Sequence, residues 1–581
     1  MLNLRFLLAF LTSIFAYAAM AAEELSPPEI QGTGLQSDLL RQMVRTEGVI
    51  TYADRDWFYI SDPSGDGNDE TSDAIQVQRR SHGFEIGDQV VVEGQVDEAA
   101  VNGENGQTIT SLRNAVVSVQ SQGNNVAPVI IGSAGRLPPT ETVFPPFQSG
   151  DITTSGMAFY ESLEGMLLRI EAPIVVGPTN RFGEFYVVVE GGQHATGMNS
   201  LGGISLSPGD TNPELLQVQV PRSLSGDAKY QVGIGDSFTF LQGVLSYDRG
   251  LYELILIESG DLTENPAPAP TIELSDIGTS QLTIGSYNVE NLDPIKESLA
   301  LVSNRNNIDD DVADGKFAGI AIQIVEGLGA PDIIALQEVQ DNDGAEFSDQ
   351  AAADQTLSVL TTAISDAGGP TYEAVMFSPA DDTAGGQPGG NIQVAFLYNP
   401  DRVSFDSASL KAISAPAFEQ SRLPLQATFG FNDTVVNVIN VHFSSKGGSD
   451  ALYGTIQPPR DRSLQQRTAQ ARAVREAVRG LASNGDHSTI VLGDFNSFWF
   501  ETPVLLLSGG TPEGRNLALD KPPLERISYT FQGNSQALDH VIAYLGTDHN
   551  AELRVLHANS IKPESQQISD HDPKLVIVSF E

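Results

Sequence analysis

The sequence contains no cysteine, and this absence excludes several classes of protein at once. Without cysteine, a chain of 581 residues has no disulfide bond, no thiolate metal site and no cysteine nucleophile. Basic residues are also scarce, because 32 Lys and Arg stand against 75 Asp and Glu, for a formal net charge of −43. A chain this acidic repels polyanions overall, so any contact with nucleic acid must be local and assisted by cations. The composition therefore argues against a protein that coats DNA.

Long apolar runs are missing as well, since no stretch reaches the roughly 20 residues that a membrane-spanning helix needs. The N-terminus has a short basic start and an apolar run over residues 6–19, followed by the small residues Ala19, Ala21 and Ala22. This order is typical of a signal peptide. We predict an export signal over residues 1–22 and a secreted protein, with the periplasm or cell surface as further options and no stable membrane insertion. No protein partner is inferable.

The pattern of residues changes along the chain, which is too long for one ordinary core. Short β-rich runs separated by Gly- and Asp-rich turns fill the first part. They predict one or two small β-barrels, with a barrel domain over residues 23–145 and a second β-rich domain over residues 146–262. A Pro- and Ala-rich stretch predicts a linker over residues 263–280. Strands then alternate with helices, which predicts an α/β domain over residues 281–581.

Polar residues follow several apolar strands of the predicted α/β domain. They are Asn288, Glu338, His442, Asp494 with Asn496, Asp539, and the pair Asp570 and His571. Each one alone reads as a turn residue or a solvated side chain. Together, at the ends of buried strands, they predict a shared cleft.

The ordered set resembles the endonuclease/exonuclease/phosphatase superfamily, which includes deoxyribonuclease I. The marks of that family are an Asn ending the first strand, "QE" after the second, a His after a central strand, "GDFN", an Asp in "LDH" and a terminal "SDH", and all occur here in this order. Sequence segments such as "PDIIALQEVQDNDG" and "HFSSKGG" are similar to those of the family's secreted bacterial nuclease branch. The phrases "TEGVIT" and "GDQVVVEGQV" resemble the oligonucleotide/oligosaccharide-binding-like (OB-like) domain that precedes many such nucleases. The resemblance implies a multidomain protein with OB-like barrels before a four-layer α/β sandwich.

The resemblance also implies a role for each polar residue. Glu338 would be the principal metal ligand, with Asn288 and Asp570 beside it. Asp494 would orient or deprotonate the attacking water, and Asn496 would hold a phosphate oxygen or the metal. His442 and His571 would donate hydrogen bonds or protons to a phosphate oxygen or to the leaving group. Asp539 would fix the position and charge of His571. Arg422 in "RLPLQATF" would bind the scissile phosphate.

The chemistry of phosphodiester cleavage explains these residue types. Carboxylate and amide oxygens suit Mg²⁺ or Mn²⁺, with Ca²⁺ as a further option. Imidazole titrates near neutrality and, when protonated, donates to phosphate oxygens. We therefore predict a secreted, metal-dependent phosphodiesterase that hydrolyses nucleic acid, as an endonuclease on DNA with RNA as a further substrate option. Two alternatives stay open: a phosphoesterase of the same fold that acts on phospholipid or sugar phosphate, and a binding protein that kept the fold without its chemistry.

Three further features carry weaker hypotheses. The acidic run from Asp62 to Asp73 has the spacing of a calcium loop, although an acidic β-turn is favoured because no helices flank it. The basic residues Lys446, Arg472, Arg475 and Arg479 would either track a nucleic-acid backbone or form a solvated helix face. Residues 498–500, Phe-Trp-Phe, are the one candidate for a membrane-contacting loop.

Overall fold

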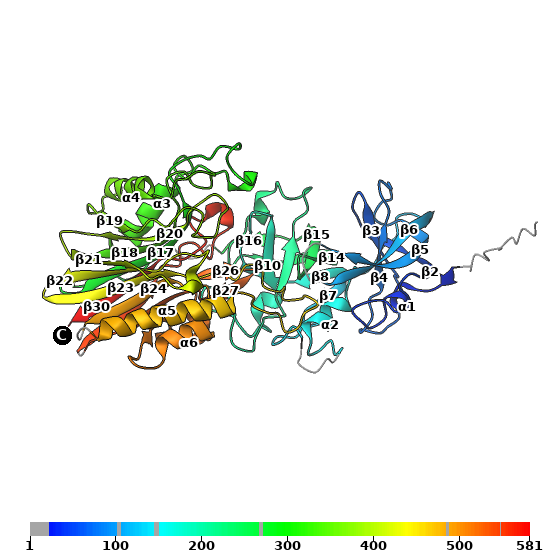
Figure 1. Ribbon diagram of the computed structural model, residues 1–581. Helices are drawn as coiled ribbons and strands as arrows, with labels where there is room; N and C mark the ends of the chain where they lie inside the picture. The colour runs from blue at the N-terminus through cyan, green and yellow to red at the C-terminus, as the bar shows by residue number, and fades with distance from the viewer. Residues whose placement is uncertain are drawn as a thin grey trace, which may run out of the picture.

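The computed structural model describes residues 22–101, 106–144, 150–265, 271–483, 487–546 and 548–580. The predicted export signal therefore lies outside the described residues, apart from Ala22. The described chain forms three regions in a row, with the N-terminal sheet at one end and the α/β region at the other (Figure 1). No helix among the described residues is long and apolar enough to cross a membrane.

The N-terminal region is a six-stranded sheet in the order β1-β2-β3-β4-β6-β5. Its elements are β1 (Glu23–Glu24), α1 (Pro27–Gln31), β2 (Met43–Ala53), β3 (Trp57–Ser61), β4 (Ala74–Gln78), β5 (Gln89–Ala100) and β6 (Thr108–Ser121). Strand β5 pairs with β6 on one side and with β2 on the other. The series of paired strands from β2 through β3, β4, β6 and β5 therefore leads back to β2. Apolar residues such as Phe58, Ile60, Ile75 and Val77 form its core. The predicted β content is confirmed here, and the OB-like assignment stays a prediction.

The middle region is a nine-stranded sheet in the order β16-β13-β9-β10-β12-β15-β14-β8-β7. Its elements are β7 (Val129–Ile131), α2 (Gly156–Glu161), β8 (Leu167–Glu171), β9 (Ile174–Gly177), β10 (Glu184–Val188), β12 (Leu216–Gln219), β13 (Ser237–Phe238), β14 (Phe240–Asp248), β15 (Leu251–Ser259) and β16 (Leu262–Thr263). Among the described residues its edge strands β16 and β7 do not pair with each other. The middle region is therefore β-rich, as predicted, but no second closed barrel is found in the part of it that the structure describes, because strand periodicity indicates which residues are buried and not whether a sheet closes.

The α/β region contains two six-stranded sheets, β19-β20-β18-β17-β30-β29 and β21-β22-β23-β24-β28-β25. The strands of the first sheet are β17 (Leu282–Leu292), β18 (Ile333–Val339), β19 (Glu373–Met376), β20 (Gln393–Tyr398), β29 (His549–Val555) and β30 (Lys574–Phe580). Those of the second are β21 (Ser404–Ala412), β22 (Leu425–Phe431), β23 (Thr434–His442), β24 (Ser488–Asp494), β25 (Arg515–Asn516) and β28 (Asp539–Tyr544). The helices are α3 (Lys316–Ile322), which continues as a π-helical turn (Gln323–Gly327), α4 (Asp354–Asp366), α5 (Leu464–Ala482) and α6 (Thr502–Ser508).

Three separate cores arrange these sheets and helices in four layers. On β18, Ile333 and Ala335 face the core between the two sheets, whereas Ile334 and Leu336 pack with α3 and α4. On β24, Val491 packs with α5 and α6 in the third core. Figure 1 shows one helix pair outside each sheet. The apolar runs lack polar alternation because both faces of these strands are buried.

The three regions are joined by contacts that the sequence did not predict. A small sheet, β11 (Ile204–Ser205), β27 (Asn534–Gln536) and β26 (Tyr529–Phe531), combines a strand of the middle region with a hairpin of the α/β region. Between the first two regions, Thr110 N donates to Glu164 Oε1 at 3.0 Å. The predicted linker is only partly separate, because Ile272, Leu274 and Ile277 pack against the α/β region, while residues 266–270 lie outside the described residues.

Candidate active site

The predicted polar residues gather at one edge of the two central sheets because of strand direction and register. Strand β17 runs parallel to β18, which brings Asn288 beside Gln337 and hence next to Glu338. Strand β23 runs parallel to β24 with His442 opposite Asp494, and Asp494 also faces Asp539, the first residue of β28. The carboxyl ends of β17, β18, β23 and β24 therefore meet at the same edge.

Glu338, His442 and Asp494 form the centre of this group. His442 Nε2 lies 3.6 Å from Glu338 Oε1 and 3.5 Å from Asp494 Oδ2. One ligand atom of each of the three residues lies within 4.8 Å of the others, a spacing that can hold a metal ion. Asn288 Nδ2 donates to Glu338 Oε1 at 2.9 Å and lies 3.4 Å from Asp494 Oδ2.

Backbone strain is concentrated at the principal predicted ligand. Glu338 has φ 58°, a left-handed conformation that costs a non-glycine residue about 1–3 kcal/mol. Its carboxylate is held by Asn288 and by the N–H of Asn291, which donates to Oε2 at 3.2 Å. Asn291 itself has φ 49°, within an irregularity of β17 between Asn288 and Leu292. The strain turns the Glu338 side chain out of the strand pleat into the cleft, and the two hydrogen bonds maintain it.

A buried amide pair behind the site was missed by the sequence analysis. Gln337 Nε2 donates to Asn440 Oδ1 at 2.7 Å, and Asn440 Nδ2 donates to the carbonyl oxygens of Leu336 and Ala395. Both amides are fully buried. Because they connect the two sheets immediately before Glu338 and His442, they fix the relative position of the two halves of the site.

His571 and Asp539 form a second, charged unit. His571 Nδ1 lies 2.9 Å from Asp539 Oδ2, and Lys574 Nζ lies 3.4 Å from the same oxygen. Burial opposes charge on His571, but the carboxylates of Asp539 and Asp570 outweigh it and hold the His571 pKa well above its usual value. Burial also opposes charge on Asp539, but His571 and Lys574 outweigh it and lower the Asp539 pKa. The unit is therefore an imidazolium held by a carboxylate, with Nε2 facing Asp494 Oδ2 at 4.0 Å.

His442 and Asp494 have the opposite electrostatic character. Burial, reinforced by the Arg422 and His571 charges, holds the pKa of His442 well below its usual value. Burial raises the pKa of Asp494 to about 7, because the Asp539 and Glu338 charges offset the hydrogen bond from Asn496 N and the attraction of His571. The two histidines, which the sequence could not tell apart, are thus a neutral His442 and a charged His571. Pairs of groups with pKa values pushed apart in this way are the usual basis of acid and base assignments.

The two predicted substrate-binding residues share a contact at the edge of the site. Arg422 Nη2 donates to the carbonyl oxygen of Phe443 at 2.7 Å, and Asn496 Nδ2 donates to the same oxygen at 3.1 Å. Asn496 N also donates to Asp494 Oδ1 at 2.7 Å. Arg422 Nε is buried and has no hydrogen-bond partner among the described residues. A guanidinium with a spare buried donor beside this cluster suits an anionic ligand.

The donor set fits a hard divalent cation. Asp570 Oδ1 is buried without a hydrogen-bond partner among the described residues, which is costly unless a cation completes it. Burial and the Glu338 charge raise the Asp570 pKa to about 6 although the His571 charge opposes them. Carboxylate oxygens of Glu338, Asp494 and Asp570 are the ligands that Mg²⁺ and Mn²⁺ prefer. The amide oxygen of Asn288 accepts from Glu290 N at 3.0 Å, so in this conformation its NH₂ group faces Glu338.

Two neighbours of the site gave no recognisable signal in the sequence. The ring of Tyr529, on the β26–β27 hairpin, lies 4.7 Å from that of His571. Glu290 has a pKa raised to about 8 by burial and by the Asp570 charge. Tyr529 reads locally as an ordinary hairpin residue, so only the tertiary structure could reveal it.

A second acidic group lies farther along the chain from β17. One carboxylate oxygen each from Asp293, Asp309 and Asp311 lies within 4.8 Å of the others. Lys316 Nζ lies 3.5 Å from Asp311 Oδ1, and Asp293 N donates to Asp311 Oδ2 at 3.2 Å. The Lys316 ammonium and the backbone N–H of Asp293 therefore already neutralise part of the charge of this acidic group.

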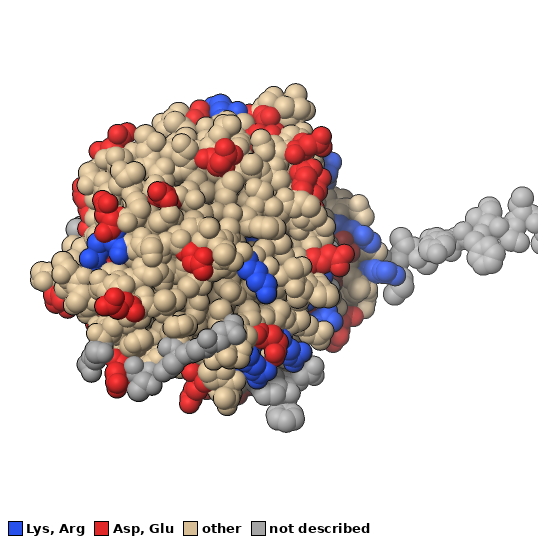
Figure 2. All heavy atoms as spheres, turned by 60° about the vertical axis from the view of Figure 1, so that its left-hand side comes forward, with Lys and Arg blue, Asp and Glu red and all other residues tan. Residues whose placement is uncertain are grey.

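Two of the basic residues that were candidates for contact with a nucleic-acid backbone are already paired within the protein. Arg475 is buried and donates to the carbonyl oxygens of Leu507 and Pro512, and Lys446 pairs with Asp461 and Glu501 at 2.7 and 2.8 Å. These two residues therefore do not form the backbone-tracking surface that was considered. On the face in Figure 2, charged side chains are scattered among uncharged ones.

The acidic run between β3 and β4 is a hydrogen-bonded loop, as the β-turn interpretation expects. Asp62 Oδ1 accepts from Ser64 N and Asp66 Oδ1 accepts from Asn68 N, each at 2.8 Å. The Phe-Trp-Phe run is partly buried and covered by cations. Lys446 Nζ lies 4.2 Å from the ring of Phe498, and the Arg526 guanidinium lies 4.3 Å from that of Trp499. This cover leaves the run poorly placed to enter a membrane.

Two family models match parts of this chain. Residues 285–571 match the Endonuclease/Exonuclease/phosphatase family, and residues 129–266 match a domain of unknown function (DUF8508). The first match covers every predicted site residue, and it supports a hydrolase of the phosphodiesterase or nuclease type. The second match falls on the middle region. No curated protein sequence matches the chain.

Several solved structures are similar to about half of this chain. Humanized D. rerio TDP2 is 16% identical, with 52% of this chain and 99% of that chain covered and a TM-score of 0.36. An endonuclease/exonuclease/phosphatase from Bacteroides vulgatus is 11% identical over 52% and 99% of the two chains, with a TM-score of 0.34. The human Nocturnin catalytic domain with bound sulfate is 15% identical over 52% and 96%, with a TM-score of 0.34.

Proposed function

We propose that this protein is a secreted, divalent-metal-dependent phosphodiesterase that hydrolyses nucleic acid, as a DNA endonuclease. The observation that carries the proposal is the meeting of Glu338, His442 and Asp494 with the His571–Asp539 pair at one sheet edge. An oxygen-rich cation site beside a fixed imidazolium suits attack at phosphorus, where negative charge must be neutralised and a leaving group protonated.

Each residue would then have a defined part in the reaction. Glu338 and Asp570, supported by Asn288, would hold the cation, which when bound neutralises phosphate charge and lowers the pKa of a coordinated water. Asp494, with its pKa near neutrality, would take the proton of the attacking water. The imidazolium of His571 would donate to the leaving oxygen as the P–O bond breaks, and Asp539 would keep its Nδ1 in place. Arg422 and Asn496 would hold non-bridging phosphate oxygens.

The choice of nucleic acid over phospholipid rests on the surface of the molecule. The Phe-Trp-Phe run over residues 498–500 is covered by Lys446 and Arg526, so it presents no bare apolar loop to a membrane. Export is proposed from the N-terminal sequence pattern alone. We also infer that the N-terminal sheet is OB-like, because the pairing of its strands β2 to β6 returns to β2.

Conversion of supercoiled plasmid to nicked and linear forms tests the proposal. The full-length protein would be assayed with Mg²⁺, Mn²⁺, Ca²⁺ or chelator, beside His442→Ala. The matched control is His194→Ala in the middle region, whose side chain is 43% exposed and pairs only with Glu190 among the ion pairs of the described residues. We expect metal-dependent nicking by wild type and His194→Ala, and none by His442→Ala. Absence of cleavage by folded wild type with every metal would overturn the nuclease proposal, and phospholipids and sugar phosphates would be tested next.

A further inference from the structure

A large groove lies between the N-terminal sheet and the middle sheet. Its volume is about 1380 Å³. From the N-terminal region it is lined by the aromatic residues Tyr52 and Trp57 and by the basic residues Arg79, Arg80 and Arg113. From the middle region it is lined by Phe182, Arg222 and Arg249. None of these residues belongs to the candidate active site.

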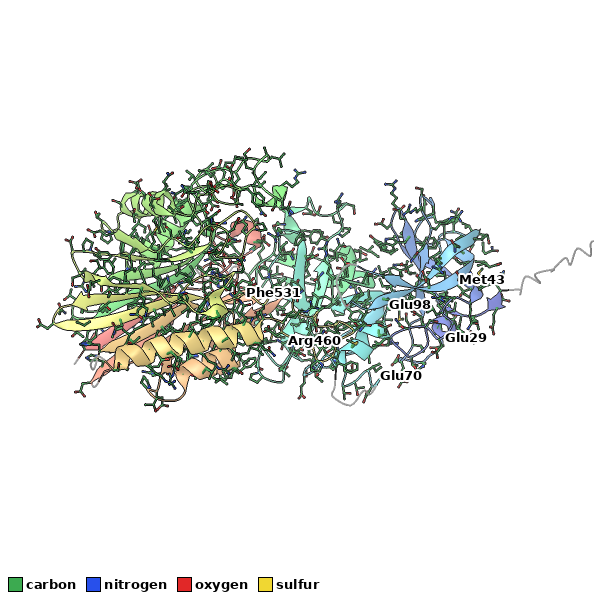
Figure 3. The ribbon with its side chains drawn as sticks, viewed as in Figure 1. Glu29, Met43, Glu70, Glu98, Arg460 and Phe531 are labelled. Carbon is green, nitrogen blue, oxygen red and sulfur yellow. The ribbon has the colours of Figure 1, made fainter. Side chains whose placement is uncertain are left out.

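A second, smaller hollow lies beside this groove and includes a residue of the candidate active site in its lining. Its volume is about 360 Å³, and its lining includes Asp570 and Glu290 at one end and Tyr529 and Phe531 beside them. It shares Phe182, Glu184, Asp248 and Arg249 with the larger groove. Phe531 is labelled in Figure 3 where the β26–β27 hairpin meets the middle region. The two hollows therefore adjoin at these four shared residues, and their combined lining draws residues from all three regions.

Aromatic rings recur along this surface. The ring of Tyr529, 4.7 Å from that of His571, is stacked with Phe531 at 6.5 Å and an interplanar angle of 15°. Phe531 and Phe182 are 52% and 58% exposed. At the far end, Tyr52 and Trp57 lie 5.3 Å apart at 32°. Phe531 and Phe182 thus present exposed ring faces, on which unpaired bases can stack, whereas Tyr52, Trp57 and Tyr529 are half-buried.

The charge of the groove differs from that of the whole protein. Five arginines in its lining stand against five acidic residues, so the groove is close to neutral in a protein of net charge −43. Arg80 and Arg222 are exposed and have no ion pair among the described residues. The guanidinium of Arg249 lies 5.4 Å from the Phe182 ring and pairs with Asp248 at 3.6 Å and with Glu184 at 3.9 Å. A polyanion thus meets less repulsion here than over most of the molecule.

We propose that this surface binds a single-stranded segment of nucleic acid whose scissile phosphate lies in the candidate active site. The inference rests on the proposed function and adds to it the substrate class: a polymer with an unpaired stretch beside the cleaved bond. Bases would stack on Phe531, Phe182 and Trp57, while Arg80 and Arg222 would contact phosphates. A duplex keeps its bases stacked on each other and offers these rings no faces, so single strands bind more tightly.

Binding of a fluorescein-labelled oligothymidylate of about 30 nucleotides, measured by anisotropy in chelator, tests the groove without requiring catalysis. The full-length protein would be compared with Trp57→Ala, Phe182→Ala, Arg80→Ala and Arg222→Ala. The matched control is Phe347→Ala, whose side chain is 53% exposed in the α/β region and does not line the groove. We expect each ring variant to weaken binding about tenfold at every salt concentration. Each arginine variant should lower the slope of log affinity against log salt by about one.

Cleavage assays separate this inference from the proposed function. The groove variants should lose about tenfold more kcat/KM on long single-stranded DNA than on bis(p-nitrophenyl) phosphate, a small diester that cannot reach the groove. Ring variants that bind oligothymidylate like Phe347→Ala would overturn the groove even if wild type cleaves DNA. The proposed groove would also be overturned if a sulfated polysaccharide displaced the labelled oligonucleotide at lower concentrations than unlabelled oligothymidylate does. Binding through these residues without cleavage of any phosphodiester would support the groove and contradict the proposed function.

Discussion

Replacing Glu338 by Gln should make the metal-free protein more stable while it abolishes activity. Glu338 and Asp494 place carboxylate oxygens within 4.8 Å of each other at the same edge of the two sheets. Two ionised carboxylates at that separation repel each other by about 3 kcal/mol at an effective dielectric constant of about 20. Because burial raises the Asp494 pKa to about 7, the Asp494 carboxylate is charged at pH 8, where it faces the carboxylate of Glu338. Gln removes this repulsion at nearly constant volume.

The substitution also removes one hydrogen bond, which reduces the gain. Glu338 accepts from Asn288 Nδ2 and from Asn291 N, and an amide offers only one acceptor oxygen for the two. The loss of one such bond costs about 1–2 kcal/mol. We therefore expect a net stabilisation of about 1–2 kcal/mol at pH 8 in chelator, seen as a thermal midpoint a few degrees higher. Turnover should fall at least about 10³-fold, or about 4 kcal/mol of transition-state free energy.

Thermal unfolding in chelator and in Mg²⁺, together with phosphodiester turnover, checks both effects. Mg²⁺ should raise the midpoint of wild type and leave that of Glu338→Gln nearly unchanged, since ligand binding to the folded state alone adds stability. Glu552→Gln, whose carboxylate is 59% exposed on β29, is the matched control and should behave as wild type. Full activity of Glu338→Gln with Mg²⁺, or a lower metal-free midpoint, would refute the reasoning.

Two other substitutions probe buried charge. Asp539→Asn leaves Lys574 buried without its counter-charge, so stability should fall by about 3–5 kcal/mol and kcat by about 10²–10⁴-fold; a wild-type midpoint and kcat would contradict the His571–Asp539 unit. Glu164 lies at the junction of the first two regions with Oε2 unpartnered among the described residues, and burial and the Glu161 charge raise its pKa well above the usual value. The folded state therefore holds a proton that the unfolded state releases, so stability is greatest below the unfolded pKa and falls as pH rises through the folded one. Glu164→Gln should be more stable than wild type at pH 8 and no more stable at pH 4; equal pH profiles would show the carboxyl to be unperturbed.

The position of the candidate site could be predicted because it follows from strand periodicity. The run before Glu338 is apolar without alternation, which indicates a strand buried on both faces, and a polar residue directly after such a strand must emerge at its end. The same logic located His442 and Asp494. A solvated helix face was one interpretation of Arg475, but this residue of α5 is buried, and its guanidinium donates to the carbonyl oxygens of Leu507 and Pro512. Helical spacing alone does not distinguish such a residue from a solvated one.

Other features depend on register and on contacts between distant segments, which the sequence does not encode locally. The Gln337–Asn440 amide pair exists because two different sheets face each other, and Tyr529 reaches His571 only through a hairpin that pairs with β11. The aromatic series of the groove draws Trp57 from β3 of the N-terminal sheet and Phe182 from the turn between β9 and β10 of the middle region. None of these residues stands out in its own stretch of sequence, because each is an ordinary strand or turn residue there.

The middle region contributes to the wall of the candidate site, and one glycine tests this contribution. A Cβ on Gly177, at the end of β9, would lie 2.4 Å from the Cα of Gly533 in the β26–β27 hairpin. That neighbour is backbone, so Gly177→Ala must displace the hairpin and with it Tyr529, at a cost of about 1–3 kcal/mol. We expect lower kcat on a small diester with retained folding, whereas Gly226→Ala, where a Cβ meets nothing within 4 Å, should match wild type. Unchanged kcat in Gly177→Ala would mean that the hairpin adapts without moving Tyr529, and that the α/β region builds its site without help from the middle region.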